Sequence, residues 1–353
     1  MAIMEGNERR GPITLHDIAQ RTGYSVNTVS RALRNKNDIS QATCARIQRT
    51  AQEMGYMGNQ IASSLRSGRT KIITVILGSM SNPYYGIMTD TLQGAAAALG
   101  YSLLIMCSRE RADLELEMAE MAAARRSDGI LLFPTNASIR TVERLRELKI
   151  PCVLMSRTLG DDVADTVVSD ETHGAYLATR HLIEHGRRNL AFLSRQHIVF
   201  SYEKRLRGFL SACEEMGIPE QNRHSFVSVP SATEDPLSCD WQTPTLSQLI
   251  QWRREGVDGI FVFCDVEAWH VQSVLQQAPE LAGWDVGIIG FDNIQGTQHF
   301  PAELCSVDCA FDEMARQGID LLRERIHGSS QPRKTIICPV QMVCRGSCGR
   351  KKT

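Results

Sequence analysis

The chain has 353 residues, 42% of them hydrophobic, and a formal net charge of −1. This length and composition predict a soluble globular protein of two or three domains with buried cores. No apolar run approaches the roughly 20 residues of a membrane helix, and the N-terminus lacks the apolar core of a secretion signal, which excludes a membrane protein and predicts a cytoplasmic one.

The charge is divided unevenly along the chain. Residues 1–71 carry 11 lysines and arginines against 5 aspartates and glutamates, whereas the remainder carries 28 against 35. A cationic head on an anionic body is typical of a protein whose head binds a polyanion and whose body does not.

The head begins with the segment ITLHDIAQRTGYSVNTVSRALRN, which contains two short helical patterns joined by a glycine. Thr14 and Asp17 have the spacing of a capping box, Gly23 makes the turn, and Ser25 caps the second helix. Ser40 caps a third helix that ends at a glycine. The predicted helices span residues 15–22, 26–34 and 41–54, and together they indicate a helix-turn-helix unit that reads DNA.

A hinge follows the head. Residues 60–66 (QIASSLR) have the composition of one short helix, and Ser67-Gly68 separates them from the first apolar strand. From there on, apolar strands alternate with amphipathic helices of 10 to 20 residues, which predicts parallel sheets wrapped by helices in two lobes with a cleft between them. The predicted strands are residues 73–77, 102–106, 129–133, 152–156, 190–194, 259–263 and 286–291.

The order of these parts resembles the lactose/galactose repressor family of bacterial transcription regulators. The resemblance rests on TVSRAL (residues 28–33), on Leu65 in the hinge and on IIGFDN (residues 288–293) in a two-lobed α/β body. The body also resembles periplasmic sugar-binding proteins. The expected fold is an all-α helix-turn-helix head plus a two-lobed α/β body with parallel sheets.

The predicted domains follow from this order. They are the DNA-binding domain, residues 13–58; the hinge, 59–71; and the effector-binding and dimerisation body, 72–342. The body divides into an N-terminal lobe, about 72–168 and 309–337, and a C-terminal lobe, about 169–308 and 338–342.

The second helix of the head is the predicted reader of base edges, because a helix fits the major groove and its N-terminal residues reach the bases. The methyls of Val26 can contact thymine, Asn27 can bond adenine, and Arg31 can bond guanine at two atoms. Ser25, Thr28 and Ser30 are better placed for phosphate oxygens. Thr14, Asn59, Ser63 and Leu65 complete the expected DNA-contacting set.

The resemblance implies that hinge helices enter the minor groove and that Leu65 wedges into the central base step. An apolar wedge beside Arg66 and Arg69 suits a kinked operator. The residue type alone is also that of an ordinary buried hinge residue.

The resemblance places a small-molecule effector between the lobes, where aromatic faces stack on a sugar ring and charged groups bond its hydroxyls. The expected ligands are Asn82, Tyr84, Tyr85, Ser156, Arg157, Arg205, Trp241, Cys264, Asp265 and Asp292. Ser156 and Cys264 depart from the family, which often has an acid and an asparagine there. A cleft with Arg157 and no adjacent acid favours a sugar acid or a sugar phosphate; a degenerate pocket without effector is the alternative.

The segment from Ser156 to Val167 also resembles the branch of the family that includes the maltose-regulon repressor MalI.

The eleven cysteines predict neither a disulfide scaffold nor a metal site, because no CxxC pair is present and Cys344 and Cys348 have no histidine near them in sequence. His181, Glu184 and His185 match the HxxEH pattern of metallopeptidases, but their place at a helix end before Gly186 favours a structural role. No other motif indicates an enzyme, and we expect no cofactor and no metal. The basic tail from Arg345 to Lys352 is expected to be solvated.

These observations predict a sequence-specific transcriptional regulator, most simply a repressor, that binds a near-palindromic operator as a homodimer and responds to a small sugar or sugar derivative. The alternative suggested by the body alone is a solute-binding protein with no role in gene regulation.

Overall fold

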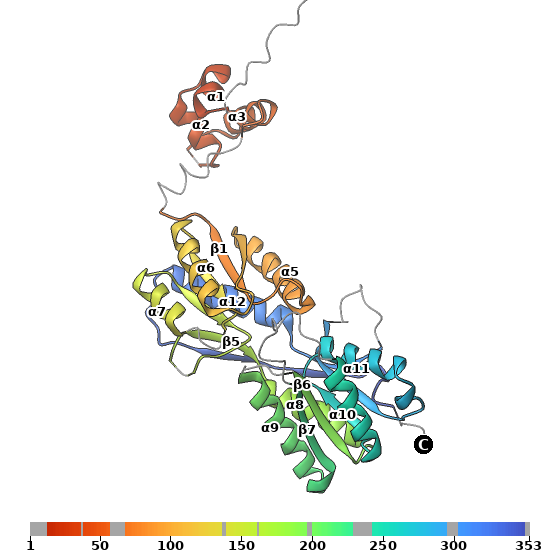
Figure 1. Cartoon of the computed structure of the whole chain (residues 1–353). Coiled ribbons are helices and arrows are strands. Elements are labelled where there is room, and N and C mark those ends of the chain that lie inside the picture. The colour runs from red at the N-terminus through yellow and green to blue at the C-terminus, as the bar shows by residue number, and fades with distance from the viewer. Residues whose placement is uncertain are drawn as a thin grey trace, which may run out of the picture. The chain divides into compact units, whose positions relative to one another are not determined.

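The computed structural model describes residues 13–36, 38–56, 68–135, 139–160, 162–195, 200–228, 242–294 and 303–349. They fall into two compact units, a head within residues 1–70 and a body within residues 71–353 (Figure 1). In the described part of the chain, no helix is both long and apolar enough to cross a membrane.

The head consists of α1 (Leu15–Thr22), α2 (Val26–Ala32) and α3 (Gln41–Glu53) around a small apolar core. The predicted caps are confirmed: Thr14 and Asp17 form a capping box, and Ser25 and Ser40 each accept a hydrogen bond from the backbone three residues on. Gly23 turns the chain with φ of 77°, a left-handed conformation that favours glycine. The core consists of Ile18, Ala19, Val29, Ala32, Ile47 and Ala51.

The second helix is shorter than predicted. It ends at Ala32 rather than Arg34, because Arg34 and Asn35 close a tight turn on the carbonyls of Arg31 and Ala32, and Asn35 adopts a positive φ of 51°. The turn sends the chain back toward α3, whose Gln48 bonds the side chain of Asn35 at 2.6 Å.

The N-terminal lobe of the body is a six-stranded sheet in the order β11-β5-β4-β3-β1-β2, and its strands pair in parallel. Helices α5 and α12 pack against each other beside it, and α6 and α7 form a second pair. The strands are β1 (Ile72–Leu77), β2 (Ser102–Cys107), β3 (Gly129–Leu132), β4 (Cys152–Met155), β5 (Asp165–Ser169) and β11 (Thr335–Cys338). The helices are α5 (Pro83–Ala98), α6 (Ala112–Ala124), α7 (Ile139–Glu147) and α12 (Phe311–Ile326).

The C-terminal lobe repeats this plan with the order β12-β10-β9-β8-β6-β7, in which β12 alone is antiparallel among the pairs described. Helices α8 and α9 pack closely together, and α10 and α11 also contact each other. The strands are β6 (Leu190–Arg195), β7 (Arg223–Ser228), β8 (Gly259–Val262), β9 (Gly287–Asp292), β10 (Cys305–Asp308) and β12 (Gln341–Val343). The helices are α8 (Glu171–Glu184), α9 (Phe200–Glu215), α10 (Gln242–Arg254) and α11 (Asp265–Gln277).

The chain passes between the two lobes three times, after β5, after β10 and after β11. The first and third crossings are joined, because the Asp170 N–H donates to the Cys338 carbonyl at a distance of 3.0 Å. In the N-terminal lobe β1 lies between β2 and β3, and in the C-terminal lobe β6 lies between β7 and β8. The strand order reverses at β1 and at β6, and ligands bind at such switch points in open parallel sheets.

The tail after β12 is not solvated as far as Gly349, which corrects the sequence prediction for this segment. Arg345 donates to the Leu304 carbonyl at 3.0 Å and to the Asn293 side chain at 2.6 Å, and the Ser347 hydroxyl donates to the Ile288 carbonyl at 2.6 Å. These bonds tie the tail to β9 and the start of β10, and Arg345 is partly buried instead of extending into solvent.

Candidate functional site

The polar face of α2 offers the side chains expected to read bases. Val26 has 37% of its surface exposed, unusual for a large apolar residue, and Asn27 beside it is also exposed. Val29 and Ala32 on the opposite face are fully buried against α1 and α3. The N-terminal end of the helix therefore presents a methyl group and an amide to the outside, as a base-reading helix does.

The guanidinium of Arg31 forms an ion pair with Asp38, a residue of the same head. The two side chains are 42% and 50% exposed, so solvent screens this pair and it stabilises the head by at most about 1 kcal/mol. Asp38 thus occupies the donor group that the sequence analysis expects to bond a guanine.

The hydroxyls expected at the phosphates have local roles. Ser25 caps α2 through the Thr28 amide at 3.1 Å and shares a hydrogen bond with the Thr28 hydroxyl at 2.9 Å. Ser30 accepts from Arg34 at 2.9 Å. Thr14 is occupied by its capping box. Asn59, Ser63 and Leu65 of the expected set lie outside the described residues.

In the N-terminal lobe, the expected effector residues gather at the carboxyl ends of the strands. Asn82 caps α5 by accepting from the Tyr84 amide at 3.0 Å, and this places Tyr84 and Tyr85 in the first turn of that helix. Tyr84 shares a hydrogen bond of 2.5 Å with Ser156, which follows β4 and has a positive φ of 64°. Burial raises the pKa of both tyrosine hydroxyls, so they act as neutral hydrogen-bonding groups.

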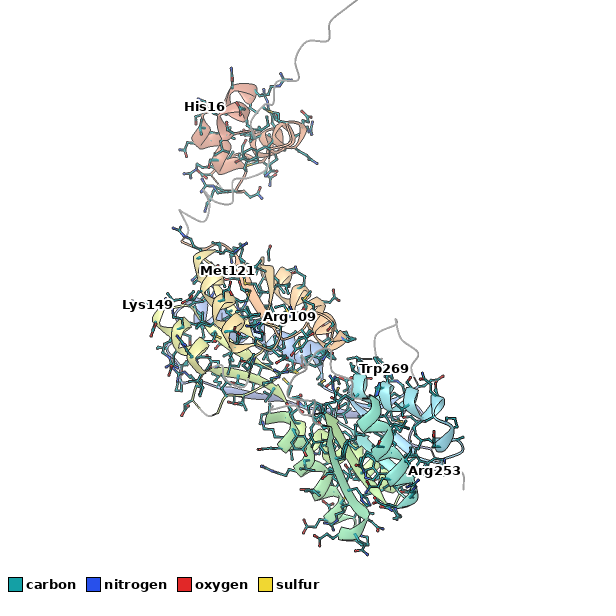
Figure 2. The ribbon with its side chains drawn as sticks, in the orientation of Figure 1. His16, Arg109, Met121, Lys149, Arg253 and Trp269 are labelled. Carbon is teal, nitrogen blue, oxygen red and sulfur yellow. The ribbon has the colours of Figure 1, made fainter. Side chains whose placement is uncertain are left out.

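Arg157 has an acidic partner that the sequence analysis missed. Its guanidinium makes two hydrogen bonds to the carboxylate of Glu110, of 2.7 and 3.0 Å, and one to the Tyr85 hydroxyl of 3.2 Å. Glu110 follows β2 with a left-handed φ of 57°, next to Arg109, which Figure 2 labels. The expectation of an uncompensated positive charge beside Ser156 is therefore wrong, because Glu110 supplies the acid from a neighbouring strand.

Arg205 of α9 anchors the C-terminal lobe side of the site. It is 5% exposed and pairs with Glu171 at the start of α8, with the Phe263 carbonyl and, at 3.5 Å, with Asp292. Its guanidinium carbon lies 3.7 Å from the ring centroid of Phe291, within cation–π distance. Glu171 thus compensates the charge of this buried cation, and the Phe263 carbonyl and Asp292 also contact it.

Asp265 and Asp292 are buried carboxyl groups with different surroundings. Asp265 accepts from the Ser306 hydroxyl at 2.6 Å and from the Ile294 amide at 2.9 Å, but burial outweighs these bonds and raises its pKa to about 7. Burial raises the pKa of Asp292 as well, against the opposing effect of Arg205. Asp292 has a φ of 105°, a strained conformation of the kind found at ligand sites.

Two further expected ligands have different outcomes. Cys264 is 8% exposed, and it lies directly before α11, next to Phe263, whose carbonyl accepts from Arg205. Trp241 lies outside the described residues. The groups that the sequence analysis did not select are Glu110, Glu171, Phe263, Phe291 and Phe311, the last of which packs on Tyr84 with ring centroids 5.1 Å apart. Their shared signal is position, since each adjoins the end of a strand or the start of a helix.

A hollow of about 400 Å³ lies away from these residues, between α7, the start of β5 and the segment before β11. Its arginines are committed to the fold, since Arg325 bonds both carboxylate oxygens of Asp165 and Arg146 donates to the Val163 carbonyl. We therefore assign the hollow no part in effector binding.

A second group of side chains comes together at the far end of α8. His181 and His185 lie beside Cys344 and Cys348, with their possible ligand atoms all within 4.8 Å of one another. No histidine lies near these cysteines in sequence, but the antiparallel pairing of β12 with β10 returns the tail to the end of α8 and brings the two histidines close in space.

Comparisons with known proteins bear on both units. Residues 14–59 match the model of bacterial regulatory proteins of the lacI family, and residues 179–348 match that of the periplasmic binding protein-like domain. The HTH-type transcriptional repressor PurR of Vibrio vulnificus (strain CMCP6) is 25% identical over 337 residues, covering 94% of this chain and 97% of the relative.

Two solved structures share the fold over nearly the whole chain. A lac repressor dimer bound to operator and the anti-inducer ONPF is 19% identical with a TM-score of 0.77, covering 96% of this chain and 99% of that one. A complex of the transcriptional regulator CelR with cellobiose is 22% identical with a TM-score of 0.65, covering 95% and 99%.

Proposed function

The chain belongs to the lacI family of bacterial regulatory proteins, and we propose that it represses transcription as a homodimer whose two heads bind the half-sites of a near-palindromic operator. It is a DNA-binding transcriptional regulator, not an enzyme, and the head excludes the alternative of a solute-binding protein without a role in gene regulation. The observation that carries the operator proposal is the N-terminal end of α2, capped by Ser25 with Val26 and Asn27 exposed beside Arg31. One such head reads too few base pairs for genomic specificity, and two-fold symmetry doubles the site.

The operator proposal is tested by selecting bound DNA from a random pool with the full-length protein. We expect a two-fold symmetric consensus whose half-sites lose definition at single positions in the Asn27→Ala and Arg31→Ala variants, each at a cost of about 1–3 kcal/mol. An asymmetric consensus, or one that neither variant alters, contradicts the proposed dimer or the proposed readers.

The hinge has its own prediction. If Leu65 wedges into the central base step, Leu65→Ala lowers operator affinity and leaves effector binding intact, because the residue lies outside the body. Operator titration and effector titration of the same preparation measure both quantities. An unchanged operator affinity rejects the wedge.

We further propose that the effector is an uncharged sugar. Arg157 already has Glu110 as its anionic partner and Arg205 has Glu171 and Asp292, so a bound anion would meet carboxylates as well as arginines. Neutral hydroxyls can accept from these guanidiniums and donate to the same acids. The solved CelR complex, whose ligand is the neutral disaccharide cellobiose, is consistent with this class.

A panel of neutral sugars, sugar acids and sugar phosphates tests the effector class, with thermal unfolding of the full-length protein as the readout. We expect stabilisation by a neutral sugar, and we expect Glu110→Gln to shift the preference toward acids or phosphates. Stabilisation of the unaltered protein by an anionic sugar alone overturns the proposal. The assignment to the MalI branch stays a prediction.

A further inference from the structure

The cluster formed by His181, His185, Cys344 and Cys348 has no part in DNA or effector binding as proposed above. The two histidines lie one turn apart at the C-terminal end of α8, and the two cysteines follow β12 with three residues between them. Segments about 160 residues apart in sequence thus bring two imidazoles and two thiols together, with ligand atoms within 4.8 Å of one another. This is the donor set of a Cys₂His₂ zinc site.

The spacing of the sulfurs fits a shared metal ion. The Sγ atoms of Cys344 and Cys348 are 3.8 Å apart. Two thiolates at about 2.3 Å from a tetrahedral zinc ion are separated by roughly 3.8 Å, whereas a disulfide requires about 2.05 Å. The imidazole centroids of His181 and His185 lie 4.0 Å apart, so both rings reach the same small volume.

The histidine nitrogens are prepared for a ligand. His185 Nδ1 lies 2.7 Å from the His181 carbonyl oxygen, and donation there fixes the tautomer that leaves Nε2 with a free lone pair. Metal-binding histidines in proteins typically carry such a bond on the second nitrogen. His181 Nε2 is buried, and the side chain that interacts with His181 is the thiol of Cys305, the cysteine next to the group. A metal ion bound by His181 would take the place of this contact with a neutral or anionic sulfur.

The loop that carries the cysteines is held in place by bonds to the body. The buried Arg187 donates from Nε to the Cys348 carbonyl at 3.1 Å. Ser347 accepts from the Cys305 amide at 2.7 Å, and the Arg345 amide donates to the Cys305 sulfur at 3.2 Å. Cys305 lies 3.8 Å from Cys344, sulfur to sulfur, at the edge of the group. The site is therefore built by contacts that do not require the metal.

Glu184 takes no part in the cluster, although it completes the HxxEH pattern. Its carboxylate accepts from Arg180 Nε at 2.8 Å, and both side chains are more than 40% exposed. A general base for metal-bound water is thus absent from this pair of histidines, and four protein ligands leave no open position. A closed set of four indicates a structural ion.

We propose that His181, His185, Cys344 and Cys348 bind one structural Zn²⁺ ion that fastens the C-terminal tail to the end of α8 and so secures β12 at the edge of its sheet.

The test is the zinc content of the full-length protein, purified under reducing conditions without chelators and measured by plasma mass spectrometry. We expect about one zinc ion per chain, lost in His185→Ala and in Cys344→Ser, both of which alter residues at the surface end of the site. His327 offers a matched control, because it also ends a helix and its Nδ1 lies 2.8 Å from the Arg323 carbonyl, but it is not part of the cluster. His327→Ala and Cys44→Ser should keep the ion.

A second readout guards against variants that fail to fold. Cobalt added to the reduced, metal-free protein should give the intense visible bands of tetrahedral Co²⁺ with thiolate ligands, and zinc should displace them. Equal zinc content in the unaltered protein and His185→Ala overturns the proposal. So does a reduced protein that neither retains zinc nor develops cobalt bands, in which case an observed Cys344–Cys348 disulfide would identify a redox pair instead.

Discussion

At the scale of single residues, the head and the body both hold the arginines of the proposed ligand sites in ion pairs. In the proposed function a base would compete with Asp38 for Arg31, whereas the acids paired with Arg157 and Arg205 would remain beside the effector. The first pair is exposed and weak, and the others are partly or fully buried and strong. Exposure therefore separates the arginine that must be free to move from those that define a rigid site.

The Arg31–Asp38 pair predicts a gain in operator affinity when it is removed. Asp38→Asn frees the guanidinium, and the lost competition of about 0.2–1 kcal/mol corresponds to an increase of up to about fivefold. Operator titration checks this, with Glu53→Gln as a control that removes an equal charge elsewhere on the head. The gain should vanish when Arg31→Ala is already present; an equal gain in that background would mean that charge alone acts.

The raised pKa of Asp265 predicts a pH dependence of stability. Between pH 4, where an unfolded aspartate ionises, and about 7, the folded protein holds a proton that the unfolded chain has lost. Stability from this group is therefore full below pH 4 and declines as the pH rises toward 7.

The Asp265→Asn variant lacks that proton exchange. As the pH rises from 5 to 7.5, we expect the free energy of unfolding of the variant, measured relative to that of the unaltered protein, to increase by about 2–3 kcal/mol. Urea unfolding at several pH values measures the difference, in which all other titrating groups cancel. Parallel curves for the two proteins would show that Asp265 is ionised throughout.

At the scale of elements, the close pairing of α8 with α9 depends on one position. A Cβ added at Gly208 would lie 2.1 Å from the Thr172 carbonyl oxygen and 2.8 Å from the Ala175 Cβ, so the helices must separate to accept it. Gly94 in α5 is also helical, but no atom lies within 4 Å of the equivalent point. Both glycines therefore have helical backbones, but a side chain would collide with α8 at Gly208 and would meet open space at Gly94.

We therefore expect opposite effects from the same substitution. Gly208→Ala should lower the free energy of unfolding by about 1–3 kcal/mol or more through overpacking, whereas Gly94→Ala should raise it by up to about 1 kcal/mol through helix propensity. Chemical denaturation of both variants provides the comparison. A stable Gly208→Ala protein would mean that α9 can shift without cost.

The sequence was informative about strands in proportion to the length of their apolar runs. The seven predicted strands are all present, each built on an apolar run, and all of them except the edge strand β2 are largely buried. β7, β11 and β12 were missed because they are edge strands with polar or very short sequences, and the buried strands β5 and β10 were missed because polar residues leave them only two or fewer consecutive apolar residues. The helix caps of the head were predictable because each depends on residues three apart.

The candidate sites were less predictable, because their partners are set by strand order. The acid beside Arg157 comes from Glu110, which is 47 residues away and arrives through the placement of β2 next to β1. The cysteines near His181 arrive through the antiparallel return of β12. Neither arrangement has a local signature, so resemblance could place the expected ligands but not the groups that neutralise them.

At the scale of the whole molecule, one buried network adjoins the places where the two lobes are connected. Glu171 lies just after the first crossing, and its carboxylate accepts from the Ser169 hydroxyl at 3.0 Å. At the second crossing, the Cys309 thiol donates to the backbone carbonyl of Asp292 at 3.3 Å. Arg205 joins the two acids. A ligand that contacts Arg205 would therefore lie next to the segments about which the lobes would rotate.

Breaking this network should lower the stability of both lobes of the body. Glu171→Gln leaves a buried guanidinium short of one acid and should cost about 3–5 kcal/mol, whereas Glu184→Gln, on the same helix but in an exposed pair, should cost less than about 1 kcal/mol. All four tryptophans follow residue 240, so their fluorescence reports the C-terminal lobe while circular dichroism reports both lobes. The two midpoints should fall together; a fall in fluorescence alone would localise the network to one lobe.

The three crossings also set the order in which the protein can be completed during synthesis. The head leaves the ribosome first and has all its parts within the first 56 residues, and β6 to β10 of the C-terminal lobe follow as a continuous stretch of chain. The N-terminal lobe starts emerging before them, yet it waits for α12 and β11, which are translated near the end. Each nascent regulator thus exposes a finished DNA-reading head well before the lobe that follows it in sequence can close its sheet, so translation itself separates the acquisition of the DNA-reading unit from the acquisition of the body that controls it.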